Sequence, residues 1–216
     1  HHLSVKNSYL QYEEDNINEN PAGKLIFSDF NLKAQNLNSN KSFQKTLVPI
    51  SIQCKFMKTS PMNVNWSFDT ARKDDFFKIS GNISNLPASQ VNLFLKPYLN
   101  VSVEGYINRL NFDFNGNSAQ IFGQMNLKHQ NLKVNILDKN TKEKKKFLSA
   151  VINLVVKTNS NKFPDNEEVN VKRDPTKSFF NLFWRGIEEG LKKTLISKKI
   201  EEKEEKIKRT VEKVKE

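Results

Sequence analysis

Apolar and polar residues alternate along the chain up to about residue 137. In the stretch from Met62 to Phe68, for example, apolar residues alternate with Asn63, Asn65 and Ser67. A period of two is typical of an antiparallel strand with one buried face. The pattern predicts about nine strands, over residues 5–12, 26–34, 50–56, 62–68, 77–83, 99–103, 110–114, 121–127 and 132–136.

Short polar segments rich in turn-forming residues separate these strands and predict a meander. The segments are Asn38-Ser39-Asn40, Thr59-Ser60-Pro61, Asn115-Gly116-Asn117 and His129-Gln130-Asn131. Between Leu86 and Pro97 the alternation stops. There we expect a short helical insertion near residues 88–96, capped by Ser89 and ended by Pro97.

The pattern changes again after residue 138. An apolar run over residues 147–156 predicts a buried helix, although periodicity alone does not separate it from a buried strand. We expect the sheet domain to comprise residues 1–160 and a polar linker, with an extended piece around residues 169–173, to occupy residues 161–175. Apolar residues at helical spacing predict an amphipathic helix over residues 176–197, followed by a charged helical tail over residues 198–216.

The predicted sheet is wider than its helices can cover. Nine strands about 4.8 Å apart span roughly 40 Å, whereas one helix covers about 10–12 Å. The sheet therefore closes on itself as a sandwich or barrel, or it curls into a trough whose apolar interior needs a ligand or partner. We expect a mainly β fold, a curled antiparallel meander with one or two C-terminal helices packing on or capping its apolar face.

Eight apolar residues are expected to line such a trough: Trp66, Phe68, Ile79, Val101, Val103, Phe112, Phe114 and Met125. The amphipathic helix has two interpretations. Its aromatic stripe packs on the sheet, or the helix lies in a membrane interface or docks to a partner. The residues that would make the second contact are Phe180, Phe183, Trp184, Lys192 and Lys193.

Composition narrows the classes of function. The 216 residues include 35 Lys and Arg against 24 Asp and Glu, a formal net charge of +11, and 16 Phe that argue against disorder. The single cysteine, Cys54, excludes a disulfide framework and a cysteine-based zinc site. No apolar run approaches the roughly 20 residues that span a bilayer.

No catalytic constellation accompanies this pattern. His129 has no ligand-type residue at metal-binding spacing, and the Asp74-Asp75 pair lacks the opposing carboxylate that acid–base catalysis needs. The lysines are spread over many strands, without the aromatic-basic motif of RNA-binding sheets. We therefore expect a non-enzymatic protein with no cofactor, no metal and no nucleic-acid partner.

Five stretches resemble a known family. They are FSDFNLKAQNL (27–37), KFMKTSPMNVNWSFD (55–69), NLFLKPYLNVSVEGYINRLNFDFNGN (92–117), LSAVINLVVKTNS (148–160) and VKRDPTKSFFNLFWRGIEEGLKKTL (171–195). These stretches are similar to the C-terminal region of AsmA-like proteins from Bacteroidota. The resemblance extends over about residues 3–196 and rests on overall pattern rather than on a catalytic signature.

The resemblance implies a cell-envelope protein. The resemblance also implies a curled sheet whose apolar interior carries phospholipid acyl chains between membranes. The implied partners are phospholipid or another acyl-chain lipid, a membrane surface and envelope proteins, in the periplasm or cell envelope. The start at His1-His2 without Met agrees with an anchor outside this chain. The alternative is a structural or assembly module of outer-membrane biogenesis, with a closed β core and a docking helix.

Overall fold

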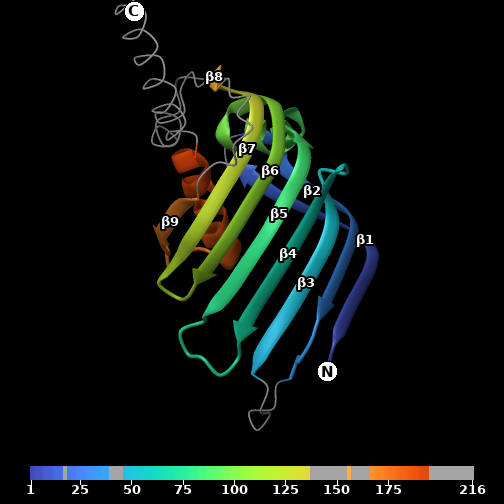
Figure 1. Ribbon diagram of the computed structural model, residues 1–216, viewed down its shortest axis with the longest axis vertical. Coiled ribbons are helices and arrows are strands. Elements are labelled where there is room, and N and C mark those ends of the chain that lie inside the picture. The colour runs from blue at the N-terminus through green and yellow to red at the C-terminus, as the bar shows by residue number, and fades with distance from the viewer. Residues whose placement is uncertain (17–18, 39–45, 137–154, 157–165, 195–216) are drawn as a thin grey trace, which may run out of the picture.

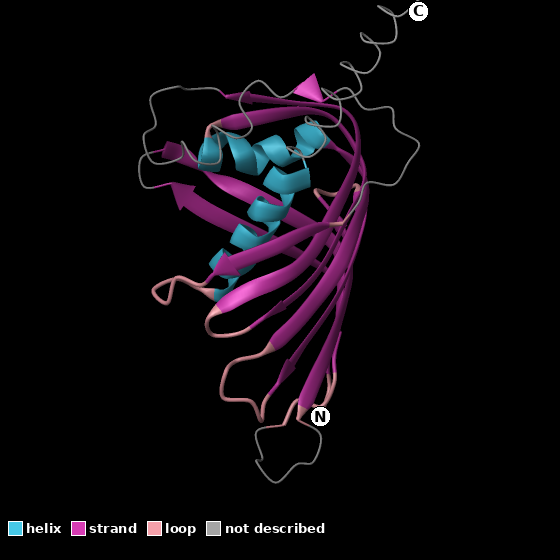
Figure 2. Cartoon of the chain, turned by 60° about the vertical axis from the view of Figure 1, so that its left-hand side comes forward, coloured by secondary structure: helices cyan, strands magenta, loops and turns pink. Residues whose placement is uncertain are grey.

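The protein forms one open, curled sheet with helices on its concave side (Figures 1 and 2). The computed structural model describes residues 1–16, 19–38, 46–136, 155–156 and 166–194. Within these residues the sheet has nine strands, ordered β1 to β8, with β9 also pairing with β7. The predicted mainly β, curled antiparallel sheet is thereby confirmed.

Seven strands form the meander, and each pairs antiparallel with the next. They are β1 (Leu3–Asn16), β2 (Glu19–Ala34), β3 (Leu47–Phe56), β4 (Ser60–Asp69), β5 (Phe77–Pro87), β6 (Val101–Gly116) and β7 (Gln120–Ile136). The meander has fewer and longer strands than the nine predicted. Residues 99–103 and 110–114 were expected to form two strands, yet β6 contains most of both, and β7 contains 121–127 and 132–136.

β-Bulges explain why two pairs of predicted strands merge. Gly105 has φ +101° and Asn131 has φ 48°. The β6–β7 register shifts between Glu104 and Tyr106 and again between Ile107 and Arg109. A bulge breaks the alternation without ending the strand, so from the sequence it is indistinguishable from a turn. The turn predicted at His129-Gln130-Asn131 is wrong, because these residues lie inside β7. The turn predicted at Asn115-Gly116-Asn117 lies slightly later, over residues 117–119, because Asn115 and Gly116 still pair with Phe122 and Ile121 at the end of β6.

The helical insertion consists of the 3-10 helix η1 (Ala88–Val91) and helix α1 (Asn92–Leu99). Its position is confirmed, but its predicted ends are wrong. Ser89 makes no capping hydrogen bond, and Pro97 lies inside α1, which ends where Asn100 adopts the left-handed conformation. The Asn92 side chain fixes the insertion to β6, since its amide donates to the Val103 carbonyl (3.0 Å) and its oxygen accepts from the Val103 N–H (2.7 Å).

Two short strands lie at the β7 edge. β8 (Val155–Val156) and β9 (Glu167–Lys172) both pair antiparallel with β7. The helix predicted over residues 147–156 is wrong for its last two residues, which form β8, and residues 147–154 lie outside the described part. The segment predicted as a linker over residues 161–175 contains β9, which overlaps the extended piece expected around residues 169–173 and becomes a strand of the sheet by pairing with β7.

The C-terminal helix, residues 179–194, packs against the concave side of the sheet (Figure 2). The predicted helix over residues 176–197 is confirmed in its central part. It begins later than predicted because Ser178 provides the cap, its Oγ accepting from the Asn181 N–H at 3.3 Å. Residues 195–197 and the predicted charged tail, residues 198–216, lie outside the described residues.

Candidate functional site

Strand register places the apolar residues in rows across the concave face. One row contains Leu3, Ala34, Ile50, Trp66, Ile79 and Phe114. The next row contains Val5, Leu32, Ile52, Val64, Gly81, Phe112 and Met125. Because successive strand residues point to opposite faces, the polar residues between these rows lie on the convex side.

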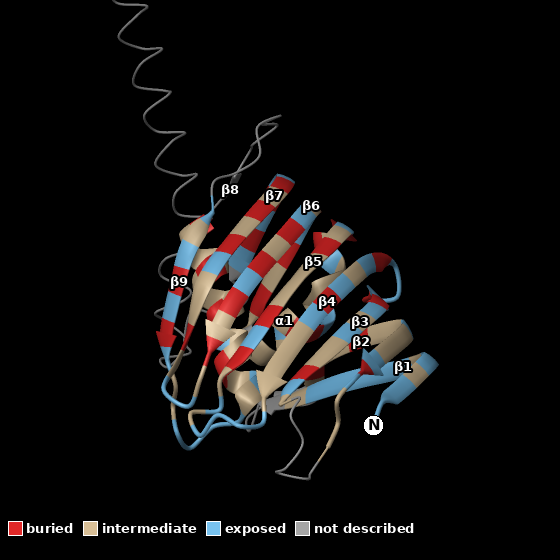
Figure 3. Ribbon diagram, turned by 60° about the horizontal axis from the view of Figure 1, so that its bottom comes forward, coloured by how far each residue is buried: buried red, intermediate tan, exposed pale blue. Residues whose placement is uncertain are grey.

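Burial is greater at the β5–β7 end of each row than at the β1 end, although Ala34 on β2 is only 3% exposed. Leu3 on β1 is 50% exposed, Ile50 and Trp66 are partly exposed, and Phe114 on β6 is completely buried. The same trend is visible in Figure 3, where β1 is largely exposed and buried residues alternate along β6 and β7. The concave face therefore has a covered part over β5–β7 and an open part made of Leu3, Leu32, Ile50 and Ile52 on β1–β3, where Ala34, Val48, Cys54 and Phe56 are nevertheless buried.

Aromatic side chains of the C-terminal helix cover the β4–β7 region. The Phe179 ring stacks on Trp66 with 5.1 Å between centroids and meets Phe77 edge-on at 4.9 Å. Further along the helix, Phe183 packs edge-on against Phe112 at 5.5 Å. These contacts show that the aromatic stripe of the helix is buried against the sheet, as the first interpretation of this stripe expected.

Two glycines bring the helix backbone close to β7. A Cβ atom at Gly186 would lie 3.2 Å from Ile121 Cδ1, and one at Gly190 would lie 2.9 Å from Met125 Cβ. The two glycines are four residues apart and therefore share one face of the helix. This pair is absent from the predicted site residues, although two glycines at this spacing on the apolar face of a helix are a recognisable signal of close packing.

An aromatic cluster joins the C-terminal helix to α1. Trp184 meets the Phe94 ring at 5.2 Å and the Tyr98 ring at 6.4 Å, both edge-on. On its other side α1 packs against β2, where a Cβ at Gly23 would lie 2.9 Å from the Phe94 carbonyl oxygen. α1 therefore holds the C-terminal helix and covers one end of the concave face.

The eight residues predicted to line a trough are all hydrophobic residues of the sheet core or packed against it. Trp66 and Phe68 are partly exposed, and the other six are between 0% and 8% exposed. The six are Ile79, Val101, Val103, Phe112, Phe114 and Met125. An acyl chain could touch Phe112 only by displacing Phe183. The accessible apolar residues lie elsewhere in the same rows and are Leu3, Leu32, Ile50 and Ile52. Their alternation with polar residues places them on the apolar face, but the predicted lining did not include them.

The residues predicted for a membrane or docking contact lie in different surroundings. Phe180 is 60% exposed and its ring lies 6.4 Å from the Tyr12 ring. Phe183 and Trp184 pack against the core. Lys193 donates to the Glu168 carbonyl of β9 at 2.8 Å, and Lys192 lies 3.8 Å from the Glu189 carboxylate. Of the three aromatic residues, only Phe180 presents a mostly exposed apolar surface.

The titratable groups near these apolar surfaces favour neutral forms. Burial raises the pKa of the Cys54 thiol to about 11, so this cysteine stays protonated at neutral pH. Burial also raises the pKa of Glu188 on the C-terminal helix and of Tyr98 on α1. Among the described residues, no group of three or more His, Cys, Asp or Glu could hold a metal ion.

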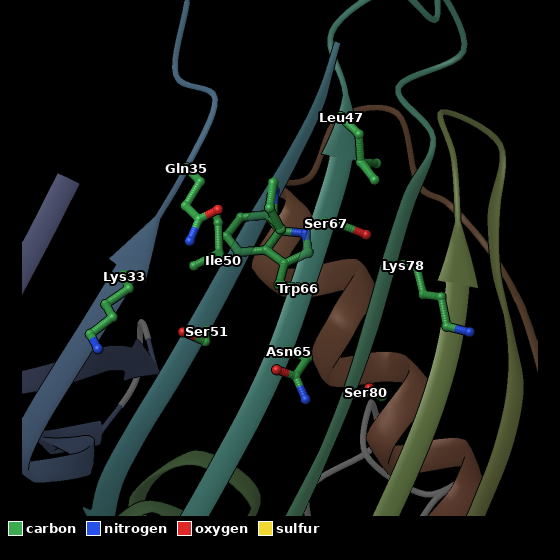
Figure 4. Close-up of a pocket in the computed structure, with 11 residues that line it drawn as sticks. Lys33, Gln35, Leu47, Ile50, Ser51, Asn65, Trp66, Ser67, Lys78 and Ser80 are labelled. Atoms are coloured by element: carbon green, nitrogen blue, oxygen red, sulfur yellow. The ribbon is translucent and has the colours of Figure 1, made fainter. Parts of the chain in front are cut away.

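The convex face is polar, with amides and hydroxyls in register across neighbouring strands. Asn63 Nδ2 donates to Asn82 Oδ1 at 3.4 Å between β4 and β5, and Asn111 Nδ2 donates to Asn126 Oδ1 at 2.8 Å between β6 and β7. A depression of about 430 Å³ lies over β2–β5 (Figure 4). Its lining consists mostly of the convex-face residues Lys33, Gln35, Leu47, Pro49, Ser51, Asn65, Ser67, Lys78 and Ser80, and it also includes Ile50 and Trp66 of the concave row.

Together these features define an open antiparallel β-sheet protein whose own helix fills part of an apolar concave face. Comparison of the chain with protein-family models, with curated proteins and with solved structures finds no match. No helix among the described residues combines the length and the apolar character needed to cross a membrane.

Proposed function

We propose that this chain is a non-enzymatic cell-envelope domain that binds phospholipid acyl chains on the open part of its concave face. The observation that carries the proposal is the row of accessible apolar side chains over β1–β3, with Leu3 half exposed and Leu32 and Ile52 partly exposed. Contiguous apolar surface of this kind is characteristic of lipid or partner contacts. An acyl chain needs no polar partner, which suits a face whose polar residues lie on the other side.

The C-terminal helix limits where such a chain can lie. Phe179 and Phe183 already occupy the concave face over β4–β6, in the place that an acyl chain would take in an unfilled trough. In this proposal the helix closes one side of the apolar surface, and the lipid occupies the β1–β3 side. The similarity to AsmA-like proteins supports the choice of phospholipid as ligand and of the cell envelope as location.

Native mass spectrometry of the purified chain, with lipid extraction in parallel, tests the proposal. We expect phospholipid to co-purify with the wild type and to be lost from the Ile52→Asp variant, whose charge would lie in the open apolar row. Gln53→Asp is the matched control, because this neighbour adds a carboxylate to the same strand on the convex face. The control variant should retain lipid, and circular dichroism should show both variants folded.

A lipid-free wild type, folded and unchanged by either substitution, would contradict the proposal. It would favour the alternative of a structural or assembly module with a closed core. The observation behind that alternative is the packing of the C-terminal helix, which buries the β5–β7 part of the face without any ligand. In that case Phe180, which remains exposed at the start of the helix, is the first residue to test for docking.

A further inference from the structure

β1 is a long edge strand. It has 14 residues and pairs on one side with β2, and no described element pairs with its other edge. Its exposed side chains include Leu3, Tyr9, Leu10 and Tyr12, with Leu10 46% exposed. An edge of this length, with free backbone donors and acceptors and apolar side chains, is a template for adding another strand.

A bulge divides β1 into two regular segments. Val5 pairs with Leu32 and Ser8 with Phe30, so Lys6 and Asn7 together lie opposite Asn31. Asn7 has φ 46°, and its N–H donates to the Asn31 side chain at 3.1 Å. The bulge shifts the alternation by one residue, so after it the even-numbered residues face the concave side.

We propose that two copies of this chain pair through β1, antiparallel, around a two-fold axis at Leu10. In this register Leu10 lies opposite Leu10 of the second copy, and Ser8 lies opposite Tyr12, all on the concave face. Tyr9 lies opposite Gln11 on the convex face. These two residues already share that face within one chain, since the Tyr9 hydroxyl donates to Gln11 Oε1 at 2.7 Å.

Charge complementarity supports a second copy as the occupant. Because the bulge adds one residue, Lys6 rather than Asn7 continues the pairing and lies opposite Glu13 of the second copy. Both side chains are on the convex face. Lys6 lies beside Asn31, and Glu13 already forms an ion pair with Lys24 of β2 at 3.4 Å, to which Lys6 of the second copy would add a second cation. The two-fold axis repeats the contact, giving two intermolecular ion pairs. Shifting the pairing of the two copies by one residue would place Leu10 opposite a convex-face residue of the second copy. The alternation of apolar and polar residues along β1 therefore specifies the register.

Pairing through β1 would join the concave faces of the two copies into one continuous surface. Leu10, which is half exposed in the single chain, would be covered by its symmetry mate. The inference rests on the edge strand alone and holds whether or not the concave face binds acyl chains. An extended strand of another protein is the other possible occupant, and the experiments below separate it from a second copy.

A charge-reversal experiment tests the register. Sedimentation velocity of the full chain should show a concentration-dependent equilibrium between the 25.0 kDa monomer and a dimer. Lys6→Glu and Glu13→Lys should each weaken the dimer about tenfold or more, because each creates two repulsive contacts. An equimolar mixture of the two variants should restore dimerisation, since both contacts become attractive again. Lys73→Glu, in an exposed loop away from β1, is the matched control for net charge.

Cysteine cross-linking provides an independent test. Residues on the axis of an antiparallel pair have Cβ atoms about 4.5–5.5 Å apart, so Leu10→Cys should form an intermolecular disulfide under mild oxidation. Cys54 does not compete, because it is buried and its pKa is raised to about 11. Leu47→Cys is the control, since Leu47 is 51% exposed on β3, away from the edge.

Three results would overturn the proposal. The first is a wild type that stays monomeric at every soluble concentration. The second is a dimer whose dissociation constant is unchanged by the two charge reversals. The third is equal cross-linking of the Leu10→Cys and Leu47→Cys variants. A monomer that gains a strand only from another protein assigns the edge to a different partner and likewise excludes the symmetric dimer.

Discussion

The two parts of the concave face have the same sequence pattern and different surroundings. Ile52 on β3 and Phe112 on β6 lie in one row of the sheet and alternate with polar neighbours in the same way. Phe112 is 4% exposed beneath Phe183, whereas Ile52 is only partly buried. Alternation therefore identifies the side of a strand that avoids water, and it does not identify what covers that side.

The width of the helix explains the difference. A helix with its side chains covers about 10–12 Å, whereas strands lie about 4.8 Å apart, so one helix covers two or three strands of a nine-stranded sheet. The C-terminal helix lies where Gly186 and Gly190 let it approach β7 and where Phe179 reaches Trp66. β1 and β2 are beyond its reach over most of their length.

The largest expected effect comes from placing a charge in each part of the face. Phe112→Asp should abolish folding or lower the free energy of unfolding by more than about 4 kcal/mol, because it leaves an unpaired carboxylate and a cavity in the core. Ile52→Asp, in the open part, should lower it by about 1–2 kcal/mol at most. Urea unfolding followed by circular dichroism measures both.

Asn115→Asp, next to Phe114 on the convex face and opposite Lys78, controls for the added charge on β6. It should remain within about 1 kcal/mol of the wild type. Equal losses of stability in the Phe112→Asp and Ile52→Asp variants would show that the two parts are covered alike, and the distinction between them would then be wrong.

An intermediate effect is expected from the helix glycines. Gly190→Ala should lower the free energy of unfolding by about 1–2 kcal/mol, because the new methyl group would overlap Met125 Cβ and push the helix away from β7. Gly186→Ala meets only the ends of the Ile121 side chain, which can move. That variant should be neutral or up to about 1 kcal/mol more stable, since alanine favours the helix.

Thermal unfolding of the two alanine variants, side by side, measures this difference. The reverse order of stabilities would mean that the helix does not rest on β7 through Gly190. The measurement also sharpens the comparison between the two parts of the face, because a lifted helix should expose the covered part to an apolar dye. The Gly190→Ala variant should then bind more dye than the Gly186→Ala variant.

The smallest effect concerns the pH dependence of the covered part. Burial raises the pKa of Glu188 in the folded chain, although Lys192 and Arg185 lower it and Glu189 raises it further. The folded state therefore binds the proton more tightly than the unfolded state, and this group costs stability as the pH rises above the ordinary glutamate range. Glu188→Gln should be more stable than the wild type at neutral pH, with the difference disappearing in acid.

Urea midpoints measured from pH 4 to pH 8 test the sign of this effect. An advantage of the Glu188→Gln variant that grows towards low pH would contradict it. Glu189→Gln, one position along the helix, is the matched control because it removes the same charge from the neighbouring carboxylate. Its profile should lack the gain in stability at neutral pH, since Glu189 forms ion pairs with Lys192 and Lys193.

Much of the sheet follows from the sequence because strand alternation is local. Only neighbouring residues are needed to predict the strands over residues 62–68 and 77–83 and the apolar side of each. The bulge at Gly105 lies in the break predicted between residues 103 and 110, and the bulge at Asn131 lies in the predicted turn at residues 129–131, because a bulge and a turn interrupt the alternation in the same way.

The sequence alone determined that the chain is a mainly β meander with one apolar face and an amphipathic helix near its C-terminus. The tertiary structure decided which part of that face stays open. Phe179 meets Trp66, and Gly190 meets Met125, across long separations in the chain. Such contacts depend on the curl of the sheet and on the position of the helix, and no local pattern encodes either. For the same reason only the fold revealed β1 as an exposed edge and the pairing of β9 with β7.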